Sequence, residues 1–413
     1  MNKESIFEAA LAMNSPWYID IIEFDDEEKR LDIFINFDRG SQFESKNPEY
    51  PGEFKAYDTK QKQWRHLNFF EHECYLHCRV PRIKPTENKI ELISPPWEGR
   101  CPGFTLLFEA LALELATHMP VLAVSKVIGE TDDKIWRMLN KYVDVARTHE
   151  DFSKVVNTGM DETSRAKGHD YISLFVDLDK RRTIFVTEGK DHSTVDRFAN
   201  DLKEHNGNPD NIKNVSCDMS PAFIKGVNEN FANASITFDK FHILKLINEG
   251  VDNVRKQEAA SEHVLKNTKY IFLKNEKNLT QKQKSTLEEL EMPKLNLKTV
   301  RALHIRQNFQ DIYAAETFED FEILLKKWYF QATHSRLEPI IKAAKTIKNH
   351  WDGVLGWFQS KINNGILEGL NSVVQAAKRK ARGFKTIQNF KTIVYLITGD
   401  LKFELVNPHV KIK

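Results

Sequence analysis

The hydrophobic pattern of this chain changes its period three times, and these changes constrain the fold more than any other feature of the sequence. Apolar and polar residues alternate between about residues 17 and 97, which is the period of β-strands. From Pro102 the spacing is helical, between residues 154 and 239 short β-branched runs return, and from Phe241 onward the spacing is helical again. A chain of 413 residues with this pattern predicts several domains, α+β overall, beginning with a small β-rich module.

The composition of the chain excludes several classes of protein. Hydrophobic residues make up 41% of the chain and aromatic residues 11%, which excludes a disordered protein. No apolar run reaches the roughly 18 residues that a membrane-spanning helix needs, so we expect no contact with a membrane. The amphipathic start does not resemble a signal peptide, and the cysteines are too few and scattered for a disulfide framework, so we expect a cytoplasmic protein. These cysteines are Cys74, Cys78, Cys101 and Cys217.

The helical stretch after Pro102 has the outline of a helix-turn-helix. A helix from about Pro120 is broken at Gly129, and Thr131 or Asp132 can cap the next helix. Two short helices around such a turn place the second in the DNA major groove. The candidate DNA contacts on this second helix, away from its apolar stripe, are Lys134, Arg137 and Lys141. A solvated face of an ordinary three-helix bundle is the alternative interpretation.

The segment from 154 to 239 predicts the order β-β-β-α-β-α-β, an α/β layer with a hairpin at one edge. Asp161 is expected to follow the first strand and Asp218 the fourth. Because strand ends at one edge of an open sheet converge, these two carboxylates are expected to approach each other. Asp218 can instead simply cap the following helix, and Asp177, Asp179 and Asp239 are competing candidates of the same residue type.

A third carboxylate, Glu368, is expected on a helix that also carries Asn371 on its polar face. The opposite, apolar face is expected to pack on the sheet through Ile366, Leu370 and Val373, leaving Glu368 directed toward the aspartates. Oxygen ligands without His or Cys select Mg²⁺ or Mn²⁺. Two such ions activate an attacking hydroxyl and stabilise the leaving oxygen at phosphorus.

These residues carry a resemblance to the ISL-three family of bacterial insertion-sequence transposases, from about residue 60 onward. The similar segments are Gly159–Ser164 with Lys167–Tyr171, Val215–Met219, Phe238–His242, Asn364–Asn371 and Lys378–Phe384. The resemblance implies an RNase H-like catalytic core with a DDE triad of Asp161, Asp218 and Glu368, serving as both catalytic and metal-binding residues. It also implies supporting roles around the triad for His169, Asp239, His242 and Asn371.

The resemblance and the periodicity together predict five regions. They are a β-rich module that resembles a degenerate zinc ribbon (1–100), the helix-turn-helix (101–150), the first part of the core (151–240), an all-helical insertion (241–360) and the C-terminal part of the core (361–413). The family's N-terminal cysteine pairs are missing, and Cys74, Cys78 and Cys101 supply at most three of the four ligands of a structural zinc site. We therefore expect no zinc.

A run of basic residues without an acid follows the Glu368 helix. Its members proposed to contact DNA phosphates are Lys378, Arg379, Lys380, Arg382 and Lys385. The predicted function is a DNA transposase that cleaves and joins double-stranded DNA at terminal inverted repeats, nucleoid-associated when bound, with a homodimer or larger assembly holding paired ends. The alternatives are a transposase-derived DNA-binding protein without cleavage and a structure-specific nuclease of the same fold.

Overall fold

The computed structural model describes residues 3–165, 171–360 and 365–412. The chain forms two compact units, Met1–Glu150 with Val374–Lys413, and Asp151–Val373. The first division lies between residues 150 and 151. The second falls within helix α14 (Gly365–Lys380), so the unit that begins the chain also contains its last 40 residues.

The first unit contains a six-stranded sheet in the order β1-β2-β5-β4-β3, with β6 paired to β5. Its core is apolar and includes Leu31, Ile33, Trp64 and Leu76. This sheet is the β-rich module expected from the alternating pattern. Its elements are α1 (Lys3–Ala10), β1 (Trp17–Asp25), β2 (Arg30–Phe37), β3 (Gln42–Glu44), β4 (Glu53–Phe69), β5 (His72–Thr86) and β6 (Lys89–Leu92).

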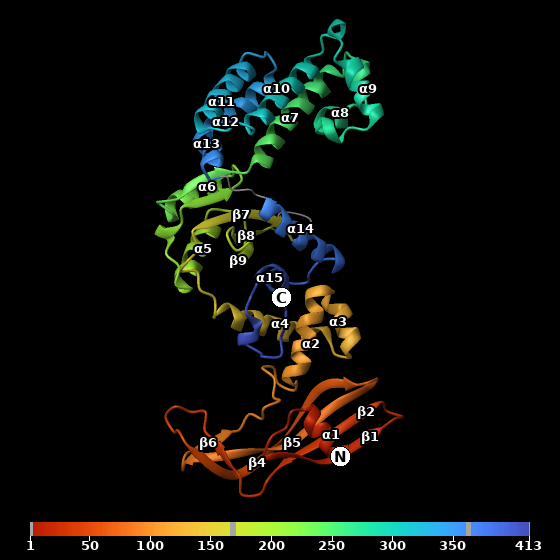
Figure 1. Ribbon diagram of the computed structural model, residues 1–413, viewed down its shortest axis with the longest axis vertical. Helices are drawn as coiled ribbons and strands as arrows, with labels where there is room; N and C mark the ends of the chain where they lie inside the picture. The colour runs from red at the N-terminus through yellow and green to blue at the C-terminus, as the bar shows by residue number, and fades with distance from the viewer. Residues whose placement is uncertain (1–2, 166–170, 361–364, 413) are drawn as a thin grey trace. The chain divides into compact units, whose positions relative to one another are not determined.

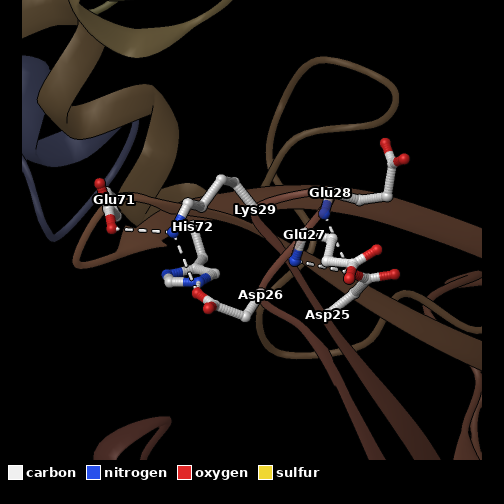
Figure 2. Close-up of polar contacts among 7 residues, drawn as sticks. All are labelled: Asp25, Asp26, Glu27, Glu28, Lys29, Glu71 and His72. Atoms are coloured by element: carbon white, nitrogen blue, oxygen red, sulfur yellow. Dashed lines mark hydrogen bonds and ion pairs between the residues drawn. The ribbon is translucent and has the colours of Figure 1, made fainter.

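The charged run between β1 and β2 forms a hairpin turn (Figure 2). Asp25 Oδ1 accepts hydrogen bonds from the backbone amides of Glu27 and Glu28, at 3.0 and 2.9 Å. The Lys29 ammonium lies 3.0 Å from Asp26 Oδ1 and 3.1 Å from Glu71 Oε1. These ion pairs are exposed, so they fix the shape of the turn more than they stabilise the fold.

Four helices complete the first unit: α2 (Leu106–His118), α3 (Val121–Ile128), α4 (Asp132–Arg147) and α15 (Ile387–Thr398). The Thr105 hydroxyl caps α2 by accepting from Phe108 N, and Gly129 ends α3 with φ +73°, a left-handed conformation that favours glycine. Helix α15 packs on α4 and α2 through an apolar face that includes the fully buried Phe390. This packing explains why the C-terminal segment clusters with the N-terminal residues.

The second unit contains a five-stranded sheet in the order β11-β10-β7-β8-β9. Strands β7, β8 and β9 are successively antiparallel, whereas β10 and β11 run parallel to β7. The predicted order β-β-β-α-β-α-β is confirmed. Its elements are β7 (Asn157–Ser164), β8 (Tyr171–Asp177), β9 (Arg182–Glu188), α5 (Ser193–Glu204), β10 (Asn214–Cys217), α6 (Pro221–Asn230) and β11 (Ser235–Phe238).

Between β11 and α14 the described chain has no strands and forms helices, several of which lie side by side (Figure 1). Trp328 is 2% exposed and packs against Phe309, so it belongs to this helical core. Among the described residues, no helix is long and apolar enough to cross a membrane. The helices are α7 (Lys240–Glu258), α8 (Lys269–Leu273), α9 (Gln281–Leu290), α10 (Lys298–Ile312), α11 (Phe318–Thr333), α12 (Glu338–Asn349) and α13 (Trp351–Ser360).

Candidate active site and nucleic-acid interface

Three aspartates occupy one register position on three adjacent parallel strands. Ser216 of β10 pairs with Gly159 of β7, so two residues further along both strands Asp218 lies beside Asp161. Cys217 pairs with Phe238 of β11, so one residue further Asp239 lies beside Asp218. We call Asp161, Asp218 and Asp239 the aspartate row. The structure thus brings together two of the predicted triad residues, 57 positions apart in the sequence.

The expectation that Asp161 follows its strand is wrong. Asp161 lies within β7, which continues to Ser164 because its antiparallel partner β8 keeps pairing with it as far as Tyr171. Strand β10 has no such partner beyond Cys217 and ends there. The aspartate row therefore marks the place where the parallel half of the sheet stops and the hairpin continues.

Backbone amides hold each member of the row. Asp161 Oδ1 accepts from Glu162 N at 2.8 Å, and Asp218 Oδ1 accepts from Ser220 N at 2.9 Å. Asp239 is the N-cap of α7, with Oδ1 accepting from Phe241 N at 2.8 Å, and its Oδ2 lies 3.3 Å from His242 Nδ1. Asp239 is 6% exposed, the most buried member of the row. These hydrogen bonds hold the carboxylates in place. Asp218 Oδ2 has no hydrogen-bond partner among the described residues.

Helix α14 packs on the sheet next to the aspartate row. Leu367 is 3% exposed and forms a small apolar cluster with Val176 and Leu178. A Cβ atom built on Gly159 would lie 2.8 Å from Leu367 Cδ1, so the absent side chain of this glycine sets the close approach of helix and strand. Ile366 and Leu370 pack against this cluster as predicted, whereas Val373 is 47% exposed and Leu367, which was not part of the predicted stripe, faces the sheet.

The amide of Asn371 connects α14 to the row by donating a hydrogen bond to Asp161 Oδ2, across 210 positions of sequence. Asn371 Oδ1 is buried and has no hydrogen-bond partner among the described residues. Glu368 lies one turn earlier on α14, is exposed, and has no hydrogen bond or ion pair with any residue of the described ranges. No group of three or more His, Cys, Asp or Glu side chains in the described ranges is close enough to hold a metal ion.

The electrostatics of the row are those of crowded carboxylates. Burial, together with the nearby Asp218 and Asp239, raises the pKa of Asp161. The contact with the Asp239 carboxylate raises the pKa of His242. A bound cation would relieve the same repulsion.

Sequence reasoning missed Glu162. Burial raises the pKa of this half-buried carboxyl group to about 7, and the charges of Asp218 and Asp161 act in the same direction. The sequence pointed to Glu162 only through its position next to Asp161, because the hydrophobic pattern does not show which carboxylates lie near the end of β10. The predicted supporting residue His169 lies outside the described residues.

The two predicted sets of DNA-contacting residues both belong to the first unit. Lys134, Arg137 and Lys141 are exposed on one face of α4. The basic run continues beyond α14 into a turn with Arg382 and Gly383 at positive φ, and exposes Arg379, Lys380, Arg382 and Lys385, while Lys378 is half-buried. The Phe384 ring lies 6.2 Å from the Trp136 ring of α4, so this turn packs beside the second helix of the helix-turn-helix outline.

The helix-turn-helix outline and the exposed basic residues of the first unit are features of a DNA-binding protein. A family profile described as "Transposase" matches residues 158–394, and one described as "Helix-turn-helix domain of transposase family ISL3" matches residues 99–143. The chain therefore belongs to the ISL3 family of insertion-sequence transposases, and its helix-turn-helix binds DNA.

Two curated relatives cover most of the chain. The transposase for insertion sequence element IS1001 of Bordetella parapertussis is 26% identical over 352 residues, which cover 81% of this chain and 84% of the relative. The transposase for insertion sequence element IS1557 of Mycobacterium tuberculosis (strain CDC 1551 / Oshkosh) is 22% identical over 362 residues, covering 79% of each chain.

Proposed function

We propose that the second unit is an RNase H-like DDE core that cleaves DNA at the terminal inverted repeats of an insertion sequence and joins the ends to target DNA. The observation that supports this most is the contact of α14 with the aspartate row through Asn371 and Asp161. It brings a helix carrying Glu368 to the place where Asp161 and Asp218 lie on neighbouring strands. The strand order with three antiparallel and two parallel strands suits such a core.

The donor chemistry of the site fits Mg²⁺ or Mn²⁺. The available groups are carboxylate oxygens of the row and the buried Oδ1 of Asn371, which has no hydrogen-bond partner within the described ranges; all are hard oxygen ligands. We propose that Asp161, Asp218 and Glu368 hold two metal ions, and that Asp239 and His242 position the neighbouring backbone. When bound, such ions lower the pKa of an attacking hydroxyl and stabilise the leaving oxygen at phosphorus.

The protein's own contribution is to hold these groups. Backbone amides orient Asp161 and Asp218, and Asn371 fixes one oxygen of Asp161. Glu368 has no partner among the described residues, so its side chain is able to turn toward the row when a cation is present. The helical residues between α7 and α13 are proposed to be the insertion of the family's core.

The direct test combines the purified chain with DNA carrying the element's ends and an unrelated target plasmid. Reactions with Mg²⁺, Mn²⁺, Ca²⁺ and EDTA are followed by sequencing of the products. The proposal expects cuts at the inverted repeats and joined products with Mg²⁺ or Mn²⁺ only. Cutting without joining would favour the nuclease alternative, and binding without cutting would favour the DNA-binding alternative. A cross-linking measurement on the paired-end complex tests the proposed dimer or larger assembly.

A further inference from the structure

Within the first unit, a pocket lies between the N-terminal sheet and α4. Its volume is about 450 Å³, and residues of β4, β5, the loop before α2 and α4 line it. Backbone hydrogen bonds join these parts, since Arg65 N donates to Gly103 O at 2.8 Å and Thr105 N donates to Arg65 O at 3.1 Å. The pocket is therefore part of one continuous framework, in which β4 is connected to the segment that leads into the helix-turn-helix.

The lining of this pocket is strongly cationic. It contains Arg65, Lys134, Arg137 and Lys141 against a single carboxylate, Glu130. Glu130 is paired with Lys134 at 2.7 Å, so most of the positive charge is left without a matching carboxylate in the lining. The only side-chain bond of Arg137 among the described residues is a long one of 3.5 Å from Nε to Asp133 O, which leaves its terminal nitrogens available.

Arg65 forms the floor of the pocket and is only 2% exposed. Its terminal nitrogens bond to neutral oxygens, including His66 O and Asn68 Oδ1, both at 2.6 Å, and its Nε is buried without a hydrogen-bond partner among the described residues. Its ion pair with Glu73 is a long one, at 3.8 Å from Nη2 to Oε1. A buried guanidinium with mainly neutral partners is costly unless an anion approaches it. Burial and the positive charge of Arg65 together lower the pKa of the neighbouring His66 to about 4.

We propose that this pocket binds a backbone phosphate of DNA, so that β4 of the N-terminal sheet and α4 hold the same DNA segment. A phosphodiester supplies the anion that the cationic lining lacks, and arginine donors suit phosphate oxygens. The exposed side chains of Lys134, Arg137 and Lys141 make the pocket reachable from solvent. The inference rests on the DNA binding of the proposed function and extends it to the N-terminal sheet.

The test uses Gln63, an exposed residue of β4 that lines the pocket. Gln63→Glu places a carboxylate among the cations, and Gln61→Glu makes the same change two residues away on the same strand, outside the lining. We expect Gln63→Glu to weaken binding of the full chain to inverted-repeat DNA about tenfold and to reduce the slope of log K against log salt by about 1. Gln61→Glu is expected to stay within about twofold of wild type. Equal thermal midpoints of the two variants show that folding is not the cause.

The results of this test distinguish a failure of the pocket proposal from a failure of the proposed function. Equal affinities of the two variants would overturn the inference alone, whereas a wild-type chain that fails to bind inverted-repeat DNA would overturn it together with the proposed function. Inorganic phosphate provides the second arm. If it raises the thermal midpoint of Gln61→Glu but not of Gln63→Glu, while their DNA affinities are the same, the pocket holds a free phosphate ligand and the assignment to DNA is wrong.

Discussion

The reactive side chains of the two sheets lie in opposite environments. In the N-terminal sheet, Cys74 and Cys78 face an apolar core, where burial raises the pKa of each thiol to about 12. In the second sheet, carboxylates gather where the parallel strands end, and the pKa of Asp161 rises because these acids are crowded and desolvated. The reactive groups of the first sheet are therefore buried and uncharged, whereas those of the second sheet are carboxylates that repel one another. Unrelieved charge of this kind is typical of functional sites.

The largest expected effect is on chemistry in the second unit. Asp218→Asn removes a charge from the aspartate row and should lower DNA cleavage at least a thousandfold, with affinity for DNA unchanged. Asp161→Asn and Glu368→Gln should behave alike. The matched control is Asp179→Asn, in the β8–β9 turn, where the carboxylate accepts from Asn157 Nδ2 at 3.0 Å. Cleavage that persists in any of the first three variants removes that residue from the proposed triad.

The next effect is on the stability of the first unit. Trp64 is 1% exposed in the N-terminal core, so Trp64→Ala should lower the free energy of unfolding by about 3–5 kcal/mol. Phe70→Ala, at a position that is 85% exposed, removes an aromatic ring from the same sheet at little cost. Thermal unfolding followed by calorimetry compares the two. Equal shifts would mean that the N-terminal sheet does not depend on its apolar core.

A smaller effect concerns DNA affinity. Changing Lys378, Arg379 and Lys380 to Gln should flatten the dependence of log K on log salt by as much as about 2–3, since each lost phosphate contact removes roughly 0.9 from the slope. The metal dependence of cleavage should stay the same. Changing Lys342, Lys345 and Lys348 to Gln removes equal charge from α12. If both triple variants flatten the slope equally, net charge and not the basic run is responsible.

The pH dependence of stability tests the crowding of acids in the second unit. The pKa of Glu162 is about 7 in the folded chain against an ordinary value of 4.5, so the folded chain retains a proton that the unfolded chain loses between these pH values. The free energy of unfolding therefore falls as the pH rises through this range. Glu162→Gln should match wild type at pH 4.5 and exceed it at pH 8 by about 1–2 kcal/mol, after allowance for the half-exposed carboxyl group. Parallel curves of thermal midpoint against pH would contradict this.

The smallest expected effect is that of a zinc chelator on the N-terminal sheet. Metal-binding thiols must be deprotonated, and burial holds those of Cys74 and Cys78 in the protonated form. The thermal midpoint should be the same with and without the chelator, and no zinc should be released when thiol reagents are added to the unfolded chain. A stoichiometric release of zinc would contradict this and show that the thiols of this sheet bind the metal.

The sequence predicted the parts of the fold that depend on local pattern. Alternating and helical periods located the helix-turn-helix and the strand order of the second sheet, because burial imposes these periods. It did not locate the end of β7 or the apolar stripe through Leu367, because these depend on which neighbour continues to pair or pack. The juxtaposition of Asp161 with Asp218 followed from strand order, while the positions of Asp239 and Glu162 depend on strand register.

The close approach between Gly159 and Leu367 has a consequence for how this chain tolerates mutation. Gly159 carries no functional group, yet an added Cβ would lie 2.8 Å from Leu367 Cδ1 and 3.0 Å from Leu178 Cδ2, so these buried leucine side chains would have to shift. A saturation scan of transposition should therefore find that alanine at position 159 lowers activity and that larger side chains lower it further. A position without any functional group would then limit transposition through the space that it leaves for the Leu367 side chain.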